Sequence, residues 1–325
     1  MLRKGNITNE KKTTISNRLL HPEYGTVIML LLSIVLGTVL SPYFLDFGFL
    51  LDSTSLFIEF GIVALCLTFI VIAGQIDLSV ASNMALTGCV VALFYEMGVP
   101  FGICIVLGLV LGLLLGLLNG FIITYFKLPS LIVTIGTLSL FRGVAQIILG
   151  DRSIGHFPTW FSGIDFRYIL GIPLPLLLFI ILFVVAALIL NKTIFGRQAY
   201  AIGTNEKAAL FSGINVTRIK MMLFASSGLI SAFAGILMIS RLGIARYNLA
   251  SGGELEIVTI TLLGGTDING GRGNVFGTFI AFFVLMTLKL GLSVANIKIE
   301  NQLTIIGFLL IFAIVFSNFI YSKQK

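Results

Sequence analysis

The fold is decided by one uninterrupted apolar stretch, residues 100–123, which reads PFGICIVLGLVLGLLLGLLNGFII. It contains no charged side chain. A helix needs about 20 consecutive, mostly apolar residues to cross the hydrocarbon core of a bilayer. Residues 100–123 therefore predict a membrane-spanning helix.

Comparable apolar runs lie on both sides of this stretch and predict an all-α, polytopic membrane protein with about ten transmembrane helices. The run at 254–266 is too short to cross alone and leads into a glycine-rich segment, so we expect the backbone to break there, where protein or a cavity surrounds it. We expect a single transmembrane domain over residues 25–321, between an N-terminal arm (1–24) and a tail (322–325). The further runs are 25–45, 55–74, 79–97, 129–149, 172–191, 219–240, 254–266, 274–294 and 303–321.

The composition agrees with this class. Hydrophobic residues make up 57% of the 325 residues and charged residues only 11%, whereas soluble domains carry about 25% charged residues. The mean hydropathy is +1.07. These values exclude an ordinary cytosolic enzyme, a disordered chain and a fibrous repeat. With three cysteines, all in apolar runs, and two histidines, we expect neither a disulfide nor a metal site.

The distribution of lysine and arginine predicts the orientation. If the N-terminus is cytoplasmic, fourteen of the 21 basic residues fall on the inner side and five on the outer side. Inner loops carry the excess of basic residues in membrane proteins. The count favours ten spans with both termini cytoplasmic. Because the charges flank apolar runs, the net charge of +7 does not indicate nucleic-acid binding. Residues 1–24 lack the apolar region and cleavage site of a signal peptide, so the first run is expected to be retained.

Four glycines recur at four-residue spacing within 100–123: Gly108, Gly112, Gly116 and Gly120. This spacing places them on one helix face, where small residues let two helix backbones approach closely. We expect a helix-packing seam. The seam either lies inside the subunit or joins two subunits.

A few charged or amide side chains fall inside predicted spans, where charge is costly. Glu59 either faces a water-filled path or extends to the membrane surface. Arg142 and Gln146 lie one turn apart and either line a solute route or hold helices together. For Lys289 we expect the long side chain to extend to the interface.

Hydroxyl side chains of the same region are candidates for a solute path, namely Thr134 and Thr137. Their hydroxyls can equally bond to carbonyls of their own helix. Asp77 and Ser79 lie in the turn before the third span. They either cap its start, because Asp and Ser suit helix N-caps, or form an inner gate.

The longest predicted inner loop, about 192–218, contains a short helix. Thr204 or Asn205 can cap its start, Glu206 suits the positive end of its dipole, and Gly213 suits a left-handed stop. A helix of about eight residues is marginal alone in water. We therefore expect it to dock, either on the chain's own inner surface or on a soluble partner.

Four stretches carry a resemblance to a known family. The chain resembles the permease subunits of ABC importers for ribose and related sugars, with small departures at Gln75 and Ala81, where the family has glycine. The four stretches are GQIDLSVAS at 74–82; NG at 119–120 with LPSLIVTIGT at 128–137 and RG at 142–143; GTNEKAA at 203–209 with SGI at 212–214; and EL at 254–255 with GGT at 264–266 and GGRG at 270–273.

The resemblance implies an all-helical importer subunit in the bacterial inner membrane that is not itself an enzyme. Two permease subunits, identical or paralogous, would enclose one path, and two ATP-binding cassette subunits would hold ATP and Mg. The chain itself contains no GxxxxGK[ST] phosphate loop and would need no cofactor. An external sugar-binding protein would dock on the outer face. Part of that surface is expected in the outer loop 150–171, at Phe157, Trp160, Asp165 and Arg167.

Two sets of site residues follow from the residue patterns and the resemblance together. ATPase coupling is expected at Thr204, Asn205, Glu206, Lys207, Ala208, Ala209, Phe211 and Gly213. The translocation path or gate is expected among Glu59, Gln75, Asp77, Ser79, Thr134, Thr137, Arg142, Gln146 and Glu254.

Three alternatives remain. The first is import of nucleosides or branched-chain amino acids within the same superfamily. The second is an ion-coupled secondary transporter, for which Glu59 and the broken eighth span are the only candidate ion site, and the third is a membrane enzyme that transfers a group to lipid. The lipid-modifying enzyme would need a convergent acid–base or metal site, whereas the charges inside the predicted spans are scattered.

Overall fold

The structure is a computed structural model of the chain. It describes residues 22–40, 44–164 and 167–322. Most of the expected N-terminal arm, part of the C-terminal tail and Asp165 lie outside the described residues.

The described chain is mostly helical, because apolar runs of this length satisfy their backbone hydrogen bonds internally. Every predicted span coincides with a helix. The helices are α2 (Pro22–Leu40), α3 (Phe47–Thr54), α4 (Ile58–Ile72), α5 (Val80–Glu96), α6 (Phe101–Tyr125), α7 (Ser130–Leu149), α8 (Thr159–Ser162), α9 (Leu174–Lys192), α10 (Ile194–Thr204), α11 (Glu206–Phe211), α12 (Val216–Leu242), α13 (Gly253–Leu263), α14 (Val275–Val294) and α15 (Ile299–Ser322).

Within the described ranges, five helices are long and apolar enough to cross a membrane: α6, α7, α9, α12 and α14. The bent pair α3 and α4, at 61°, makes a sixth if it counts as one span. Helices α2, α5 and α15 are shorter apolar helices over the residues searched. The eighth predicted span is α13, which has 11 residues and ends at Leu263. The chain is thus a multi-pass helical protein with five or six clear spans.

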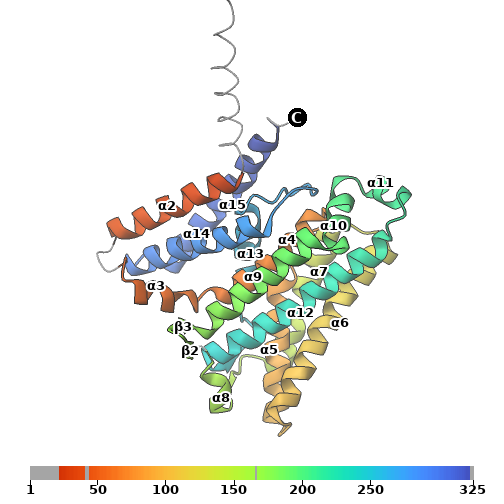
Figure 1. Ribbon diagram of the computed structural model, residues 1–325. Coiled ribbons are helices and arrows are strands. Elements are labelled where there is room, and N and C mark those ends of the chain that lie inside the picture. Colours follow the sequence, from red (N-terminus) through yellow and green to blue (C-terminus); the bar gives the residue numbers. More distant parts are fainter. Residues whose placement is uncertain (1–21, 41–43, 165–166, 323–325) are drawn as a thin grey trace, which may run out of the picture.

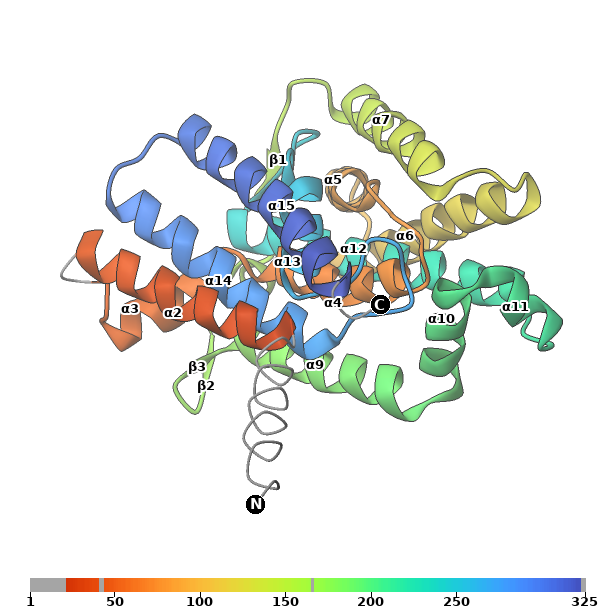
Figure 2. The same ribbon diagram turned by 90° about the horizontal axis from the view of Figure 1, so that it is seen from above.

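Helix α4 forms the centre of the molecule, with α9, α12, α13 and α14 around it (Figures 1 and 2). All of its residues except Cys66 are buried. A helix that is apolar on every side has to be enclosed by other helices. The sequence of α4 therefore explains its central position.

The glycine stripe of α6 packs against α12 of the same chain. A Cβ added to Gly112 would collide with Ala232, and one added to Gly116 would collide with the carbonyl oxygen of Phe224. This seam therefore joins two helices inside the subunit, as the first of the two sequence interpretations predicted. Gly108 contacts α5 and α12, and Gly120 lies against Met221.

Two short antiparallel strand pairs lie in loops between helices. Strand β1 (Ile154–Gly155) pairs with β4 (Ile244–Ala245), and β2 (Tyr168–Ile169) pairs with β3 (Ile172–Pro173). The hydroxyl of Tyr168 donates to Asp52 Oδ1 at 2.9 Å. This hydrogen bond raises the pKa of Tyr168.

The outer loop 150–171 differs in one respect from the expected docking surface. Trp160 is half exposed, and its carbonyl accepts from Arg167 Nη2 at 3.2 Å. Phe157, in contrast, is buried and packs against Phe101 and Phe161. Phe157 is therefore a core residue of the loop, and the prediction that it forms part of the surface was wrong.

Candidate translocation site

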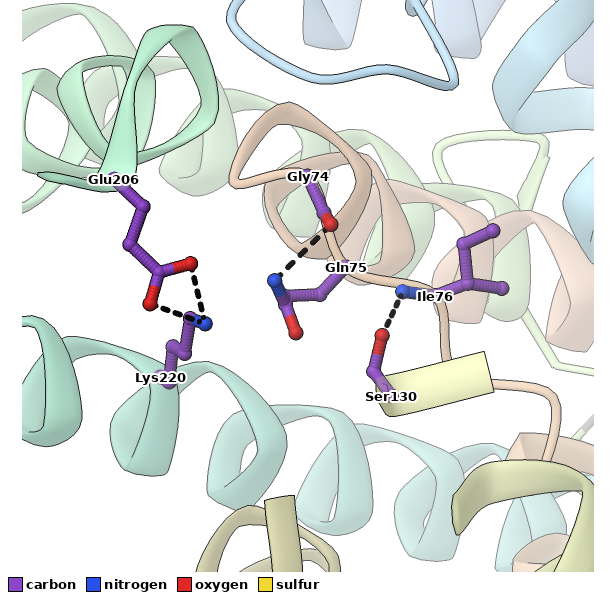
Figure 3. Close-up of polar contacts among 6 residues, drawn as sticks. All are labelled: Gly74, Gln75, Ile76, Ser130, Glu206 and Lys220. Atoms are coloured by element: carbon purple, nitrogen blue, oxygen red, sulfur yellow. Dashed lines mark hydrogen bonds and ion pairs between the residues drawn. The ribbon is translucent and has the colours of Figure 1, made fainter. Parts of the chain in front are cut away.

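The turn between α4 and α5 is fixed to the start of α7. The backbone N–H of Ile76 donates to Ser130 Oγ at 3.0 Å, and Thr134 Oγ1 donates to the carbonyl of Ile76 at 3.2 Å. Gln75 is buried, and its Nε2 donates to the carbonyl of Gly74 at 3.0 Å (Figure 3). The amide that replaces the family's glycine thus folds back onto its own turn.

Asp77 is a buried acceptor that joins three elements. Its Oδ1 accepts from the backbone N–H of Ser79 at 3.0 Å and from Ser79 Oγ at 2.6 Å. Its Oδ2 accepts from Ser227 Oγ on α12 at 2.7 Å. Asn119 Nδ2 on α6 donates to Ser79 Oγ at 2.8 Å. This network ties the turn to α6 and α12. Ser79 occupies the N-cap position of α5, but its side chain makes no capping bond.

Four glycines form a junction where three segments meet: Gly74 before α5, Gly203 in α10, and Gly270 and Gly271 between α13 and α14. A Cβ added to Gly203 would collide with the carbonyl oxygen of Ile72 and with Gly271 N, and a Cβ on Gly270 would lie 2.7 Å from Gly74 Cα. The N–H of Gly271 donates to the carbonyl of Ile72 at 2.7 Å. We call this contact the glycine junction.

Helix α11 has the capped form that its sequence predicts. Asn205 Oδ1 accepts from the N–H of Ala208 at 3.0 Å, and Gly213 has φ +83°. The side chain of Phe211 is 88% exposed. Figure 1 shows α11 at the edge of the molecule, beyond α10. The helix therefore presents a large aromatic side chain with no intramolecular cover.

The remaining predicted coupling residues lie around this helix. Thr204 is the last residue of α10, and its Oγ1 donates to the carbonyl of Tyr200 at 2.9 Å. Lys207 is exposed, whereas Ala209 is buried. One face of α11 is therefore packed on the chain and the other is free.

Glu206 holds α11 against α12 through an ion pair. Lys220 Nζ donates to both carboxylate oxygens, at 2.9 and 2.8 Å (Figure 3). Lys220 is buried, while the Glu206 side chain is half exposed. The sequence predicted that Glu206 interacts with the helix dipole and did not predict Lys220 as its partner. A signal was present, because Lys220 is a charged residue inside the predicted span 219–240.

Glu59 does neither of the two things expected of it. Its side chain is 1% exposed, and its Oε1 accepts from Arg241 Nε at 2.7 Å. Its other oxygen, Oε2, is buried and has no hydrogen-bond partner. Neither exposure at a water-filled path nor extension to the surface describes this residue. It forms a buried ion pair between α4 and the end of α12.

Lys289 also turns inward, so the expected extension to the interface was wrong. Its Nζ donates to both oxygens of Glu256, at 2.8 and 2.9 Å, and lies 5.2 Å from the ring centre of Phe57. The pair joins α13 to α14. Partner charges therefore compensate two of the charges that the sequence showed as scattered.

Arg142 holds segments of the chain together, which is one of the two roles that the sequence predicted for it. Its Nη1 donates to the carbonyls of Tyr247 and Leu249, at 2.8 and 2.5 Å. The guanidinium also interacts electrostatically with Glu254, in the first turn of α13. Glu254 Oε2 is buried without a hydrogen-bond partner, and Gln146 is exposed one turn along α7. Arg142 on α7 and Glu254 on α13 therefore interact across the helices, whereas Gln146 is exposed on α7. Thr137, in contrast, bonds to the carbonyl of Thr134 in its own helix at 3.4 Å.

Five or six long apolar helices, joined in part by ion pairs at buried side chains, define a multi-pass helical membrane protein. Residues 49–314 match the family described as branched-chain amino acid transport system / permease component. The chain belongs to this permease family.

Two relatives have names that give their cargo. The chain is 38% identical over 293 residues to the ribose import permease protein RbsC of Bacillus subtilis (strain 168), covering 90% of this chain and 91% of the relative. It is 38% identical over 299 residues to the autoinducer 2 import system permease protein LsrD of Escherichia coli (strain K12), with the same coverage. No solved structure matches the chain.

Proposed function

We propose that the chain is the membrane-spanning permease subunit of an ATP-driven importer, and that it carries a monosaccharide such as a ribose-like pentose, a deoxyhexose or a related furanose. The observation that carries this proposal is the 38% identity, over 90% of the chain, to the ribose and autoinducer 2 import permeases. The bacterial cytoplasmic membrane is the proposed location.

The proposed topology has ten spans and two cytoplasmic termini. The pairing of loops supports it. The three segments of the glycine junction are in contact, and this topology places all of them on the inner side, near residues 74, 203 and 270. Strands β1 and β4 are outer segments, and they pair with each other. In this topology helices α2, α5, α13 and α15 are the four further spans beside the six clear ones.

The proposed ATPase contact is α11 with its flanking residues. Phe211 supports this because a large exposed aromatic side chain outside the membrane favours a protein partner. ATP and Mg would be held by the ATP-binding cassette subunits. Motion of α11 would reach the turn at Gly74 through α10 and the glycine junction, since backbones in contact there leave no space for independent movement.

The proposed solute path runs along α7 and α13. The interacting charges of Arg142 and Glu254 support this, because ionisable residues inside a membrane protein mark solute pathways. Glu254 Oε2 is buried and has no hydrogen-bond partner. A second permease subunit, identical or paralogous, would close the path from the other side. A solute-binding protein would deliver the sugar to the loops around Trp160.

The test is affinity purification of the chain from its native membrane in mild detergent, with mass spectrometry of the proteins that accompany it. We expect an ATP-binding cassette protein and a solute-binding protein. Binding of sugars by that solute-binding protein then identifies the cargo. A chain that purifies alone in stable form, and transports only with an ion gradient, would contradict the proposal.

Branched-chain amino acid import is a second candidate, because the description of the matching family names it. The ligand of the co-purified solute-binding protein distinguishes amino acid import from monosaccharide import. A protein that binds leucine, isoleucine or valine and no sugar would replace the monosaccharide with an amino acid. The role of the chain as a permease subunit would stand.

A further inference from the structure

An apolar cavity of about 400 Å³ lies between α4, α9, α10 and α12. Helix α9 contributes Leu182, Ala186 and Ile189 to its wall, and α12 contributes Met222, Ser226 and Ile230. None of these side chains is charged. In Figure 2, α9 lies on the opposite side of the molecule from α7. The lining of the cavity includes none of the residues proposed for the solute path, Arg142, Gln146 and Glu254.

Both helical walls end in a cation on the same side of the molecule. Lys192 follows Ile189 by three residues on α9, and Arg218 precedes Met222 by four residues on α12. Residues three or four apart share one helix face, so each cation continues the line of cavity residues. Both are exposed, and neither forms an ion pair with another residue that the structure describes.

We propose that this cavity binds an acyl chain of an anionic phospholipid, with the lipid phosphate held between Lys192 and Arg218. The apolar wall matches hydrocarbon, and the two cations match a phosphodiester that carries a net negative charge. A zwitterionic phospholipid offers the same acyl chain without the net charge. In the proposed topology the cations face the cytoplasmic leaflet, whose anionic lipids attract basic residues near the membrane surface.

A native cysteine in the cavity wall allows occupancy of the cavity to be measured. Cys66 lines the cavity and is partly exposed, whereas Cys89 and Cys104 are buried. Alkylation of the full-length chain in mild detergent by a membrane-permeant maleimide will therefore act first at Cys66. A Cys66→Ser variant provides the background rate.

The experiment compares phosphatidylglycerol with phosphatidylcholine of the same acyl chains as protectants of Cys66. Each basic residue near an anionic lipid is worth about fivefold in affinity, so two predict half-protection at about 30-fold less phosphatidylglycerol than phosphatidylcholine. A double variant, Lys192→Gln with Arg218→Gln, should remove this difference. Because both positions are exposed, the variant should fold normally.

The matched control is Lys127→Gln with Lys298→Gln, which removes the same net charge from two exposed positions away from the cavity. It should keep the 30-fold difference. Native mass spectrometry of the same samples gives a second measurement, because bound lipid adds mass. Equal protection by both lipids, or a preference that survives the Lys192 and Arg218 changes, would overturn the proposal. So would protection of Cys66 that follows self-association and not added lipid.

Discussion

At the scale of single residues, the molecule holds charge at membrane depth by pairing it across distant segments. Glu59 and Arg241 are 182 positions apart and meet at 2.7 Å. Lys289 and Glu256 meet at 2.8 Å. A buried ion pair adds little net stability by itself, but losing one member leaves a charge without compensation. Such pairs therefore fix which helices lie side by side.

Glu59→Gln tests this conclusion. The change removes the carboxylate that pairs with the Arg241 guanidinium, and we expect the free energy of unfolding to fall by about 3–5 kcal/mol, as when one member of a buried ion pair is lost. Titration with a denaturing detergent, followed by loss of helical circular dichroism, measures it. Glu300→Gln, at an exposed position on α15, is the control and should change stability by less than about 0.5 kcal/mol. Equal losses in both variants would contradict the pairing argument.

Gly203→Ala tests the glycine junction. The added methyl group has no space beside the Ile72 carbonyl, and overpacking of this kind costs about 1–3 kcal/mol. We expect lower stability and a loss of transport, with the ATPase still bound, because α11 itself is unchanged. Gly136→Ala on α7 is the control, since no atom lies within 4 Å of its added Cβ. Normal transport by the Gly203 variant would show that the close approach has no role in coupling.

At the scale of elements, α11 is the clearest test of partner binding. Phe211→Ala should leave the stability of the chain unchanged, because the ring is exposed, and should reduce co-purification of the ATPase by about tenfold or more, the effect expected of an interface hot spot. Phe47→Ala is the matched control, since Phe47 is 75% exposed on α3, an outer helix in the proposed topology. Equal ATPase yield from the wild type and the Phe211 variant would remove α11 from the proposed interface.

The α6–α12 seam gives a second test at this scale. Gly116→Ala should lower the free energy of unfolding by about 1–3 kcal/mol, because its Cβ collides with the backbone of α12. Gly102→Ala on the same helix meets no atom within 4 Å. It should be neutral or stabilising by up to about 1 kcal/mol, since alanine favours helix more than glycine does. Thermal unfolding of the two variants in the same detergent distinguishes the destabilising effect of the packing collision from the stabilising effect of alanine on the helix.

These elements also show what the sequence could predict. The ends of α11 depend on local chemistry, a side-chain cap at Asn205 and a left-handed glycine at Gly213, and both were predictable. Helix α3 was missed because its eight residues are too few for a search based on spans of about 20. The partner of Glu59 could not be predicted, because pairing over 182 positions depends on how the helices pack and leaves no local pattern.

At the scale of the whole molecule, the sides of the membrane are the property on which the proposed function depends. An importer needs α11 on the side of the ATPase and the loop around Trp160 on the side of the solute-binding protein. The positive-inside count assigns the basic loop 192–218 to the cytoplasm. The glycine junction and the β1–β4 pair agree with this assignment, because each brings together segments that the count places on one side.

Single-cysteine variants test the orientation directly. In a background with Cys66, Cys89 and Cys104 replaced by serine, Lys298→Cys should react with a membrane-impermeant maleimide in intact cells, because residue 298 lies outside in the proposed topology. Lys127→Cys should react only after the membrane is opened. Both lysines are exposed in loops, so the thiols should react equally fast once the reagent reaches them. Labelling of both from outside would require an even number of spans between 127 and 298 in place of the predicted five, and would contradict the ten-span topology. The reverse pattern, with Lys127→Cys labelled from outside and Lys298→Cys only after the membrane is opened, would turn the whole chain over. That arrangement would place α11 outside, where the ATPase of an importer could not reach it.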